Sequence, residues 1–266
     1  MQMAPGTADH TPGRFVWYDL VTNDIPAARA FYGELFDWEF EEIPDHPNKF
    51  VLIRSGGIPI GGLVQLDRQN PDSTESQWIG SLSVTNVDSM VQRFVDRGGA
   101  VLGGPVDIER RGRVAVVSDP QGAILALVRT EDGDPPAREP RIDDWLWQEL
   151  WTTDGPSALV FYQETMGYQS QTVEVDVGAY HVLQRDGHSY AGLAQLPWDS
   201  VPPVWLPYIK VEDPAAMAGR VEGLGGRVVL SPDQIRNGNA AVIEDPTGGM
   251  LAIQRWPPED QAGGGQ

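Results

Sequence analysis

Two acidic residues that lie next to tryptophan are the side chains in this sequence best placed to carry out chemistry. Asp19 follows Trp17 in FVWYDLV, and Glu149 lies between Trp147 and Trp151 in WLWQELW. A carboxylate enclosed by aromatic rings can act as a general base or accept a hydrogen bond from a ligand. It can equally bond to backbone or arginine and hold the fold together, because buried polar groups are usually paired. We take Asp19 and Glu149 as candidate catalytic residues, with both roles open.

Other side chains could contact a ligand near these acids. The tryptophans could stack on a flat ligand, although core packing explains any one of them alone. Tyr208 could donate a hydrogen bond, and His181 could join Glu149 in an unconventional metal site. Gln65 and Gln195 recur on otherwise apolar strands, where they could face a ligand or tie strands together. The candidate ligand-binding residues are Trp17, Trp147, Trp151, Tyr208, His181, Gln65 and Gln195.

A basic cluster, Arg110-Arg111-Gly112-Arg113, stands out in an otherwise acidic sequence. It falls between two expected strands, where a hairpin tip is predicted. A solvated turn explains it, and the alternative is that it attracts an anionic ligand.

The two acids occupy matching places because one stretch of the chain occurs twice. FVWYDLVTNDIPAARAFYGELFDW at 15–38 returns as WLWQELWTTDGPSALVFYQETMGY at 145–168. In each copy, a run of aromatic and β-branched residues predicts a strand. The aspartate and proline that follow it are typical of a helix start. A match over a whole strand and helix indicates an internal repeat.

The residues after each copy predict a β-α-β-β-β module that occurs four times. In the first half, the expected strands are 15–21, 38–43, 49–54, 58–66, 78–84, 100–108, 113–118 and 123–129, and the expected helices are 25–36 and 88–97. Residues 145–256 repeat this plan. The pairs Gly61-Gly62 and Gly98-Gly99 lack the lysine of a phosphate loop, so we expect them to be turns and helix stops.

This order of elements predicts an α+β fold. A β-α-β-β-β module curls because strands twist, and its helix covers only the outer face. Two modules facing each other would enclose a cleft, so we expect one cleft in each half. Alternation along the strands then gives the residues on the cleft face, which are Trp17, Asp19, Val21, Trp147, Glu149, Trp151, Leu206, Tyr208 and Lys210.

The domain boundaries follow from the repeat and from composition. We expect a flexible tail at 1–13, a first domain at 14–130, a charged and proline-rich linker at 131–143, a second domain at 144–256 and a flexible tail at 257–266. Residues 67–75 are expected to form a polar loop.

Composition limits the partners. The formal net charge is -19, so nucleic acid and anionic membrane surfaces are poor partners. The chain has no cysteine, which excludes disulfides and thiolate sites and fits a cytoplasmic protein. We expect a small-molecule ligand. The two halves could imitate a dimer of single-domain proteins, so both a monomer and a homodimer stay open.

The tandem modules, the N-D-x-P-x-A-x-x-F-Y helix start at 23–32 and the D-P-x-G hairpins at 119–122 and 245–248 resemble the vicinal oxygen chelate superfamily. That superfamily includes glyoxalase I, bleomycin-resistance proteins, fosfomycin-resistance enzymes and extradiol dioxygenases. The resemblance covers nearly all of residues 15–256. It is closest to two-domain glyoxalase-like proteins that carry a hydroxylase label.

The resemblance also implies where a metal ion would bind. The superfamily's metalloenzymes place His or Glu at strand positions that correspond here to Trp17, Trp147, Ile79, Leu206, Ala126 and Ala252. None of these side chains offers an imidazole nitrogen or a carboxylate oxygen to a divalent ion. We therefore expect no metal and no other cofactor.

The resulting hypothesis is a metal-independent protein that binds a small apolar or aromatic metabolite in a tryptophan-lined cleft. One alternative is a lyase, isomerase or hydroxylase-like enzyme that uses Asp19 or Glu149 as a general base. A metal-dependent glyoxalase or dioxygenase with non-standard ligands is the remaining alternative.

Overall fold

The computed structural model describes residues 9–44, 49–66, 76–175, 178–196 and 202–258. The expected loop at 67–75 and most of both expected tails lie outside the described residues. None of the helices in these ranges has the length and apolar character needed to cross a membrane.

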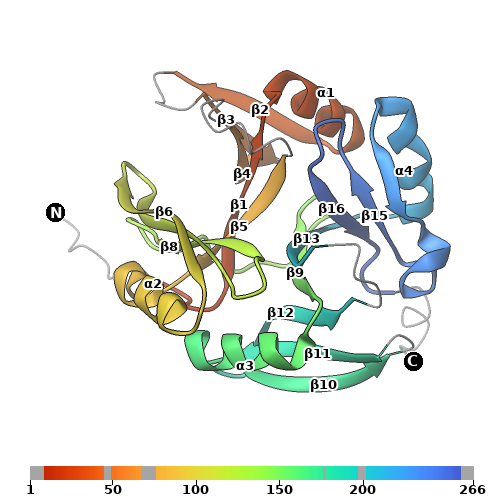
Figure 1. Ribbon diagram of the computed structural model, residues 1–266. Coiled ribbons are helices and arrows are strands. Elements are labelled where there is room, and N and C mark those ends of the chain that lie inside the picture. Colours follow the sequence, from red (N-terminus) through yellow and green to blue (C-terminus); the bar gives the residue numbers. More distant parts are fainter. Residues whose placement is uncertain (1–8, 45–48, 67–75, 176–177, 197–201, 259–266) are drawn as a thin grey trace, which may run out of the picture. The chain divides into compact units, whose positions relative to one another are not determined.

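The fold consists of two eight-stranded mixed sheets, one from each half of the chain, with few helices (Figure 1). In the first half the strand order is β2-β3-β4-β1-β5-β8-β7-β6, and in the second it is β10-β11-β12-β9-β13-β16-β15-β14. The elements of the first half are β1 (Phe15–Thr22), α1 (Ile25–Leu35), β2 (Trp38–Ile43), β3 (Phe50–Ser55), β4 (Ile58–Gln65), β5 (Gln77–Ser83), α2 (Val87–Asp96), β6 (Ala100–Ile108), β7 (Gly112–Ser118) and β8 (Ile124–Arg129). Those of the second are β9 (Trp145–Thr152), α3 (Gly155–Met166), β10 (Gln169–Val175), β11 (Gly178–Arg185), β12 (His188–Gln195), β13 (Val204–Lys210), α4 (Pro214–Val221), β14 (Arg227–Leu230), β15 (Ala240–Glu244) and β16 (Met250–Gln254).

This order confirms the α+β class and the repeated β-α-β-β-β module. The helix starts form as the sequence predicts, since Asp24 and Asp154 accept hydrogen bonds from the first turns of α1 and α3. The interpretation of Gly61-Gly62 as a turn was wrong, because both residues lie inside β4. Gly98 has φ +90 just after α2, as expected for a helix stop.

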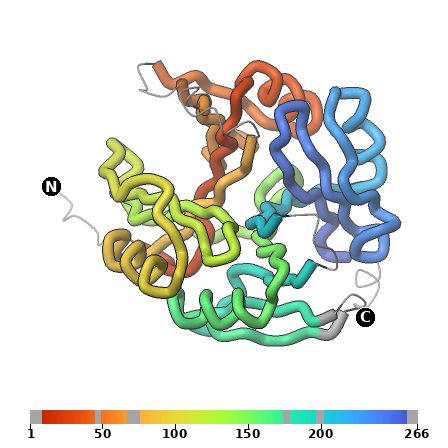
Figure 2. The backbone as a smooth tube through the Cα atoms, in the orientation of Figure 1, coloured from red at the N-terminus to blue at the C-terminus, as the bar shows by residue number. Residues whose placement is uncertain are grey.

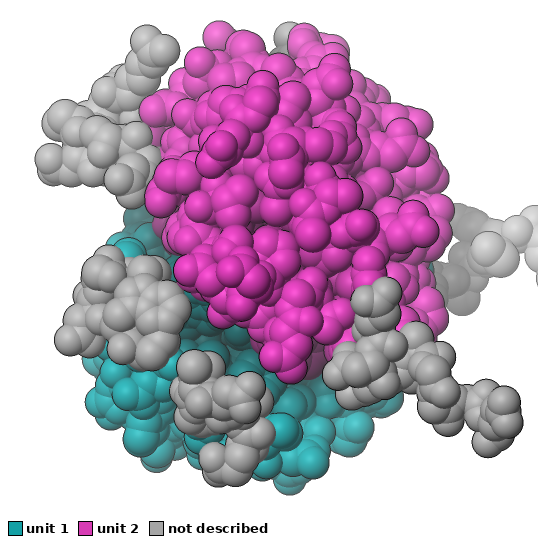
Figure 3. All heavy atoms as spheres, turned by 90° about the vertical axis from the view of Figure 1, so that its right-hand side faces the viewer, with its two compact units in different colours: residues 1–17, 80–137, 148–205 teal, residues 18–79, 138–147, 206–266 magenta. Residues whose placement is uncertain are grey.

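The chain divides into two compact units that do not coincide with the halves (Figure 3). Unit 1 comprises Met1–Trp17, Gly80–Ala137 and Gln148–Trp205, and unit 2 comprises Tyr18–Ile79, Arg138–Trp147 and Leu206–Gln266. Each unit therefore combines a module from the first half with a module from the second.

Helix packing accounts for this division. In unit 1, α2 lies against α3, where the Phe94 and Phe161 rings meet edge to face at 5.0 Å. In unit 2, α1 lies beside α4, and the path of the backbone tube shows the same neighbours (Figure 2). Each helix thus packs on strands of its own half and also against the helix of a module from the other half.

Two buried hydrogen-bond relays join the motifs that first identified the repeat. In unit 2, Trp78 Nε1 donates to the Tyr32 hydroxyl at 2.8 Å, and that hydroxyl donates to Asp245 Oδ2 at 2.8 Å. In unit 1, Trp205 Nε1 donates to the Tyr162 hydroxyl at 2.8 Å, which donates to Asp119 Oδ2 at 3.0 Å.

In each relay, the tyrosine of the F-Y helix motif and the aspartate of the D-P-x-G hairpin come from different halves. Burial first, and the neighbouring carboxylate second, raise the pKa of Tyr32 and of Tyr162 well above the usual value. Both phenols therefore stay protonated and act as donors. These repeated motifs hold the fold together.

The segments flanking the halves are attached to their own units. In unit 1, Thr11 N donates to Asp134 Oδ2 at 2.7 Å, and His10 Nε2 lies 3.0 Å from the Thr130 carbonyl oxygen. Residues 9–13, which we expected to belong to a flexible tail, are therefore hydrogen-bonded to the segment after β8.

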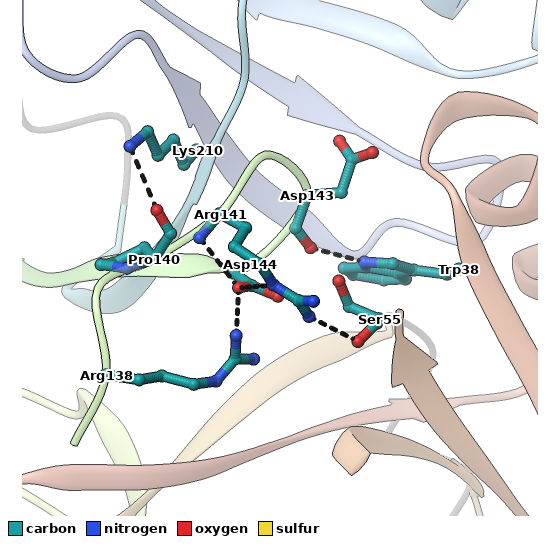
Figure 4. A network of polar contacts seen from close by, with 8 residues as sticks. All are labelled: Trp38, Ser55, Arg138, Pro140, Arg141, Asp143, Asp144 and Lys210. Atoms are coloured by element: carbon teal, nitrogen blue, oxygen red, sulfur yellow. Dashed lines mark hydrogen bonds and ion pairs between the residues drawn. The ribbon is translucent and has the colours of Figure 1, made fainter. Parts of the chain in front are cut away.

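In unit 2, the end of the expected linker forms a polar network around Asp144 (Figure 4). Asp144 is 2% exposed, and its Oδ2 accepts from Arg138 Nη1 at 2.6 Å and from Arg141 N at 2.9 Å. Trp38 Nε1 donates to the Asp143 carbonyl at 2.8 Å, and Lys210 Nζ donates to the Pro140 carbonyl at 3.1 Å. The segment 138–144 is thus part of the folded unit.

Replacing Asp144 with alanine should lower the free energy of unfolding by about 2 kcal/mol, because the buried charged acceptor is lost and Arg138 and Arg141 lose the bonds they donate to it. Burial opposes ionisation of Asp144, but the bonds from Arg138 and Arg141 outweigh it and lower the pKa. A carboxyl whose folded pKa is lowered stabilises above its unfolded pKa, so this contribution should disappear as the pH falls below about 4. Urea unfolding at several pH values measures both effects. Glu139→Ala, at an exposed position of the same segment, is the control; an equal loss there would contradict the prediction.

Candidate functional site

The Glu149 carboxylate is held by two donors within unit 1. Trp151 Nε1 donates to Glu149 Oε1 at 2.7 Å, and the Tyr180 hydroxyl donates to Oε2 at 2.9 Å. The strand register explains the geometry. Tyr180 pairs with Ala194, and Ala194 pairs with Trp151, so Tyr180 and Trp151 lie on one face of the sheet. Glu149 is two positions before Trp151 on the same strand and shares that face. Glu149 is 2% exposed. Both of its oxygens are therefore fixed in position by aromatic side chains.

Asp19 lies at the matching place in unit 2, but its surroundings differ. It is buried on β1 and pairs with Gly62 of β4. A Cβ on Gly62 would lie 2.2 Å from the Phe50 ring and 2.9 Å from Asp19 Oδ1, so this glycine makes room for both groups. By register, Phe50 and Val21 stand where Tyr180 and Trp151 stand in the second half. Their side chains carry no hydrogen-bond donor, so the two acids have diverged.

The predicted aromatic residues differ in burial. Trp17 and Trp147 are half-buried, whereas Trp151 is buried and already bonded to Glu149. Tyr208 is fully buried in unit 2, with the Arg236 guanidinium carbon 5.5 Å from its ring centroid. That distance is within the range of a cation–π contact.

His181 does not share a face with Glu149. It pairs with Leu193, and Leu193 pairs with Leu150, so alternation directs His181 to the opposite face of the sheet. Its Nδ1 lies 3.0 Å from Thr172 Oγ1 on the neighbouring strand. The metal-binding pair that we considered for these two residues is not formed.

The two glutamines lie at the ends of β4 and β12, next to strand-to-helix connections. Gln65 Nε2 donates to the Asn23 carbonyl at 3.0 Å, and Gln195 Oε1 accepts from Gly155 N at 3.3 Å. Each side chain therefore ties its strand to the start of α1 or α3.

The described residues at the strand positions compared with metalloenzymes do not fit a divalent metal ion. Within the part of the chain that the structure describes, no group of three or more His, Cys, Asp or Glu side chains could hold one. Ala126 and Ala252 pair with Ser81 and Tyr208 on the adjoining strands, so these positions carry a methyl group, a hydroxyl and a phenol. Carboxylate and imidazole, the usual ligands for such ions, are absent from both pairs.

Two features of the site were not predicted from the sequence. Tyr180 was not among the predicted site residues, because its role depends on the register between β11, β12 and β9. Arg111 was placed in a solvated turn, yet its Nη2 donates to Ser81 Oγ at 2.9 Å. The sequence signal for the second contact was the basic cluster itself.

A family model, the Glyoxalase/Bleomycin resistance protein/Dioxygenase superfamily, matches residues 14–127. Among curated proteins, the chain is 27% identical over 259 residues to the protein named Putative glyoxylase CFP32 of Mycobacterium bovis, covering 96% of this chain and 99% of that protein. It is 27% identical over 261 residues to the anthracycline biosynthesis protein DauV of Streptomyces sp. strain C5, covering 91% and 93%.

Solved structures share the fold at low sequence identity. The Mn(II)-bound glyoxalase from Novosphingobium aromaticivorans matches with a TM-score of 0.61 and 17% identity, covering 93% of this chain and 83% of that one. A variant of homoprotocatechuate 2,3-dioxygenase from B. fuscum matches with a TM-score of 0.60 and 13% identity, covering 96% and 74%.

Proposed function

Because residues 14–127 match the model of the Glyoxalase/Bleomycin resistance protein/Dioxygenase superfamily, we propose that the chain binds a small apolar or aromatic metabolite without a metal ion. The observation that carries this proposal is the buried Glu149 carboxylate, fixed between Trp151 and Tyr180. A fixed acceptor surrounded by aromatic rings suits a ligand with a flat apolar body and one hydrogen-bond donor.

The donor set supports metal independence. At the strand positions that the superfamily's metalloenzymes use, this chain has tryptophan, isoleucine or leucine, and alanine. Metal analysis of protein purified without chelators should find no stoichiometric divalent ion. One ion per half would overturn this part of the proposal.

Replacing Glu149 with glutamine should reduce the preference for ligands that carry a donor. Naphthol and naphthalene differ by one hydroxyl, so the ratio of their dissociation constants isolates the contribution of the hydrogen bond from that hydroxyl to Glu149. Wild-type protein should prefer naphthol, and Glu149→Gln should reduce that preference about tenfold, since a hydrogen bond to a charged group contributes about 1.5–3 kcal/mol. Tryptophan fluorescence titration measures both constants.

Two controls accompany this variant. Glu164→Gln changes an exposed acid of unit 1 and should leave the ratio unchanged. Tyr180→Phe keeps the ring but removes the hydroxyl that donates to Glu149, so it should change the ratio by a smaller factor than Glu149→Gln. If neither naphthol nor naphthalene quenches tryptophan fluorescence in a saturable way, the proposal fails.

A second candidate function is catalysis on the same residues. It is favoured by the relatives, whose names include a glyoxylase and a protein of anthracycline biosynthesis and whose matches extend over nearly the whole chain. Asp19 and Glu149 are then the candidate general bases, in different surroundings, because Val21 and Phe50 lie beside Asp19 where Trp151 and Tyr180 lie beside Glu149. Asp19→Asn would abolish turnover of a true substrate, whereas in a pure binding protein it would change affinity alone.

A further inference from the structure

The arginines of the basic cluster have different roles. Arg113 forms a surface ion-pair group, with its Nε 2.6 Å from Asp88 Oδ2 and its Nη1 3.0 Å from Asp107 Oδ2. Arg111 reaches the inner strand of its module, where Nη2 donates to Ser81 Oγ at 2.9 Å. Ser81 is 0% exposed, so a guanidinium group from the hairpin tip contacts a fully buried hydroxyl.

A second buried hydroxyl lies on the same face of β5. Ser83 is two positions after Ser81, and alternation gives the two side chains a common direction. The Ser83 hydroxyl is buried and has no hydrogen-bond partner among the described residues. An unpaired buried hydroxyl costs about 1–3 kcal/mol, so its presence needs an explanation. The Ser81 hydroxyl accepts from Arg111, and its own proton is therefore available for a further acceptor.

In unit 2 an arginine also lies beside the matching strand position, but over an aromatic ring. Tyr208 stands where Ser81 stands in the first half, since each pairs with the alanine that follows its D-P-x-G hairpin. Arg236, from the connection between β14 and β15, lies over the Tyr208 ring. Its backbone has φ 50 and that of Asn237 has φ 51, in the left-handed region that non-glycine residues seldom adopt. Strain of this kind is typically retained where it positions a functional side chain.

We propose that Arg111, Ser81 and Ser83 bind an acidic oxygen of the ligand, such as a carboxylate, phenolate or sulfonate, and that Arg236 with Tyr208 provides the corresponding contact in unit 2. This inference rests on the proposed function and specifies its ligand class. Guanidinium and hydroxyl groups are the donors that recognise such oxygens. The overall charge of -19 repels anions, so a local cation is required for a chain like this one to hold an anionic ligand.

A matched pair of fluorescent probes tests the inference. Anilinonaphthalene sulfonate and phenylnaphthylamine share one aromatic framework and differ by the sulfonate. Wild-type protein should bind the sulfonated probe more tightly. The double variant Arg111→Gln/Arg236→Gln should reduce that preference about tenfold or more, as expected for loss of charge-assisted hydrogen bonds. Arg113→Gln removes the same charge from the surface and should leave the preference unchanged.

Ser83→Ala provides a second arm that does not depend on the arginines. It removes an unpaired hydroxyl, so the protein should fold at least as well while binding the sulfonated probe severalfold more weakly. If both probes bind with equal affinity, or if Arg113→Gln changes the preference as much as the double variant does, the inference is wrong and the proposed function stands. If neither probe binds in a saturable way, both are wrong.

Discussion

Replacing Asp245 with alanine should lower the free energy of unfolding by about 4 kcal/mol, because one side chain satisfies four donors. Asp245 Oδ1 accepts from Thr247 N at 2.6 Å, from Thr247 Oγ1 at 2.7 Å and from Gly249 N at 3.1 Å. Its Oδ2 accepts from the Tyr32 hydroxyl at 2.8 Å. The residue is 3% exposed, so water cannot replace these bonds. Urea unfolding followed by tryptophan fluorescence measures the loss.

The relay predicts a graded series of variants. Tyr32→Phe removes the hydroxyl that joins Trp78 to Asp245 and should cost about 2 kcal/mol, with the hairpin bonds intact. Asp88→Ala breaks an exposed ion pair with Arg113 and should cost far less stability than either relay variant, because solvent screens the pair. A loss for Asp245→Ala no larger than that for Asp88→Ala would show that the relay does not hold the fold. Asp119→Ala should behave in the same way, through Tyr162.

The order of elements could be predicted from the sequence, whereas the packing partners could not. Local signals place the helix starts at Asp24 and Asp154 and the strands after them, because capping and alternation depend only on neighbours in the chain. The relays join a tyrosine of one half to an aspartate of the other. A repeat gives no indication of which copy packs against which, so the compact units had to be seen in the structure.

The candidate site, too, could be predicted only in part from the sequence. Alternation correctly placed Trp151 on the face of Glu149. It could not supply the bond from Tyr180, because the register between β11 and β12 includes a shift at Leu183/Gln184. A shift of one residue moves every side chain beyond it to the other face. Once the register is known, alternation directs His181, next to Tyr180 in the sequence, away from Glu149.

Gly61→Ala should be among the most destabilising single substitutions in β4, with a loss of about 3 kcal/mol in the free energy of unfolding. A Cβ on Gly61 would lie 2.4 Å from the Tyr18 carbonyl oxygen. That oxygen belongs to the backbone of β1, which pairs in parallel with β4 at this position. It can move only if the ladder between the two strands opens, so relief by a side-chain rotation is not possible.

Gly62→Ala is the matched variant one position along the same strand. Its added methyl would meet the Phe50 ring and Asp19 Oδ1, which are side-chain atoms that can move. Gly62→Ala should therefore lower the free energy of unfolding less than Gly61→Ala does, but it should displace the Asp19 side chain. Combining it with Phe50→Ala makes room for the methyl, so the double variant should be more stable than the sum of the single losses predicts. Equal losses for Gly61→Ala and Gly62→Ala, with no coupling to Phe50, would contradict this prediction. They would mean that the two glycines do not have different roles, one allowing the close approach of β1 and β4 and the other leaving space for Asp19.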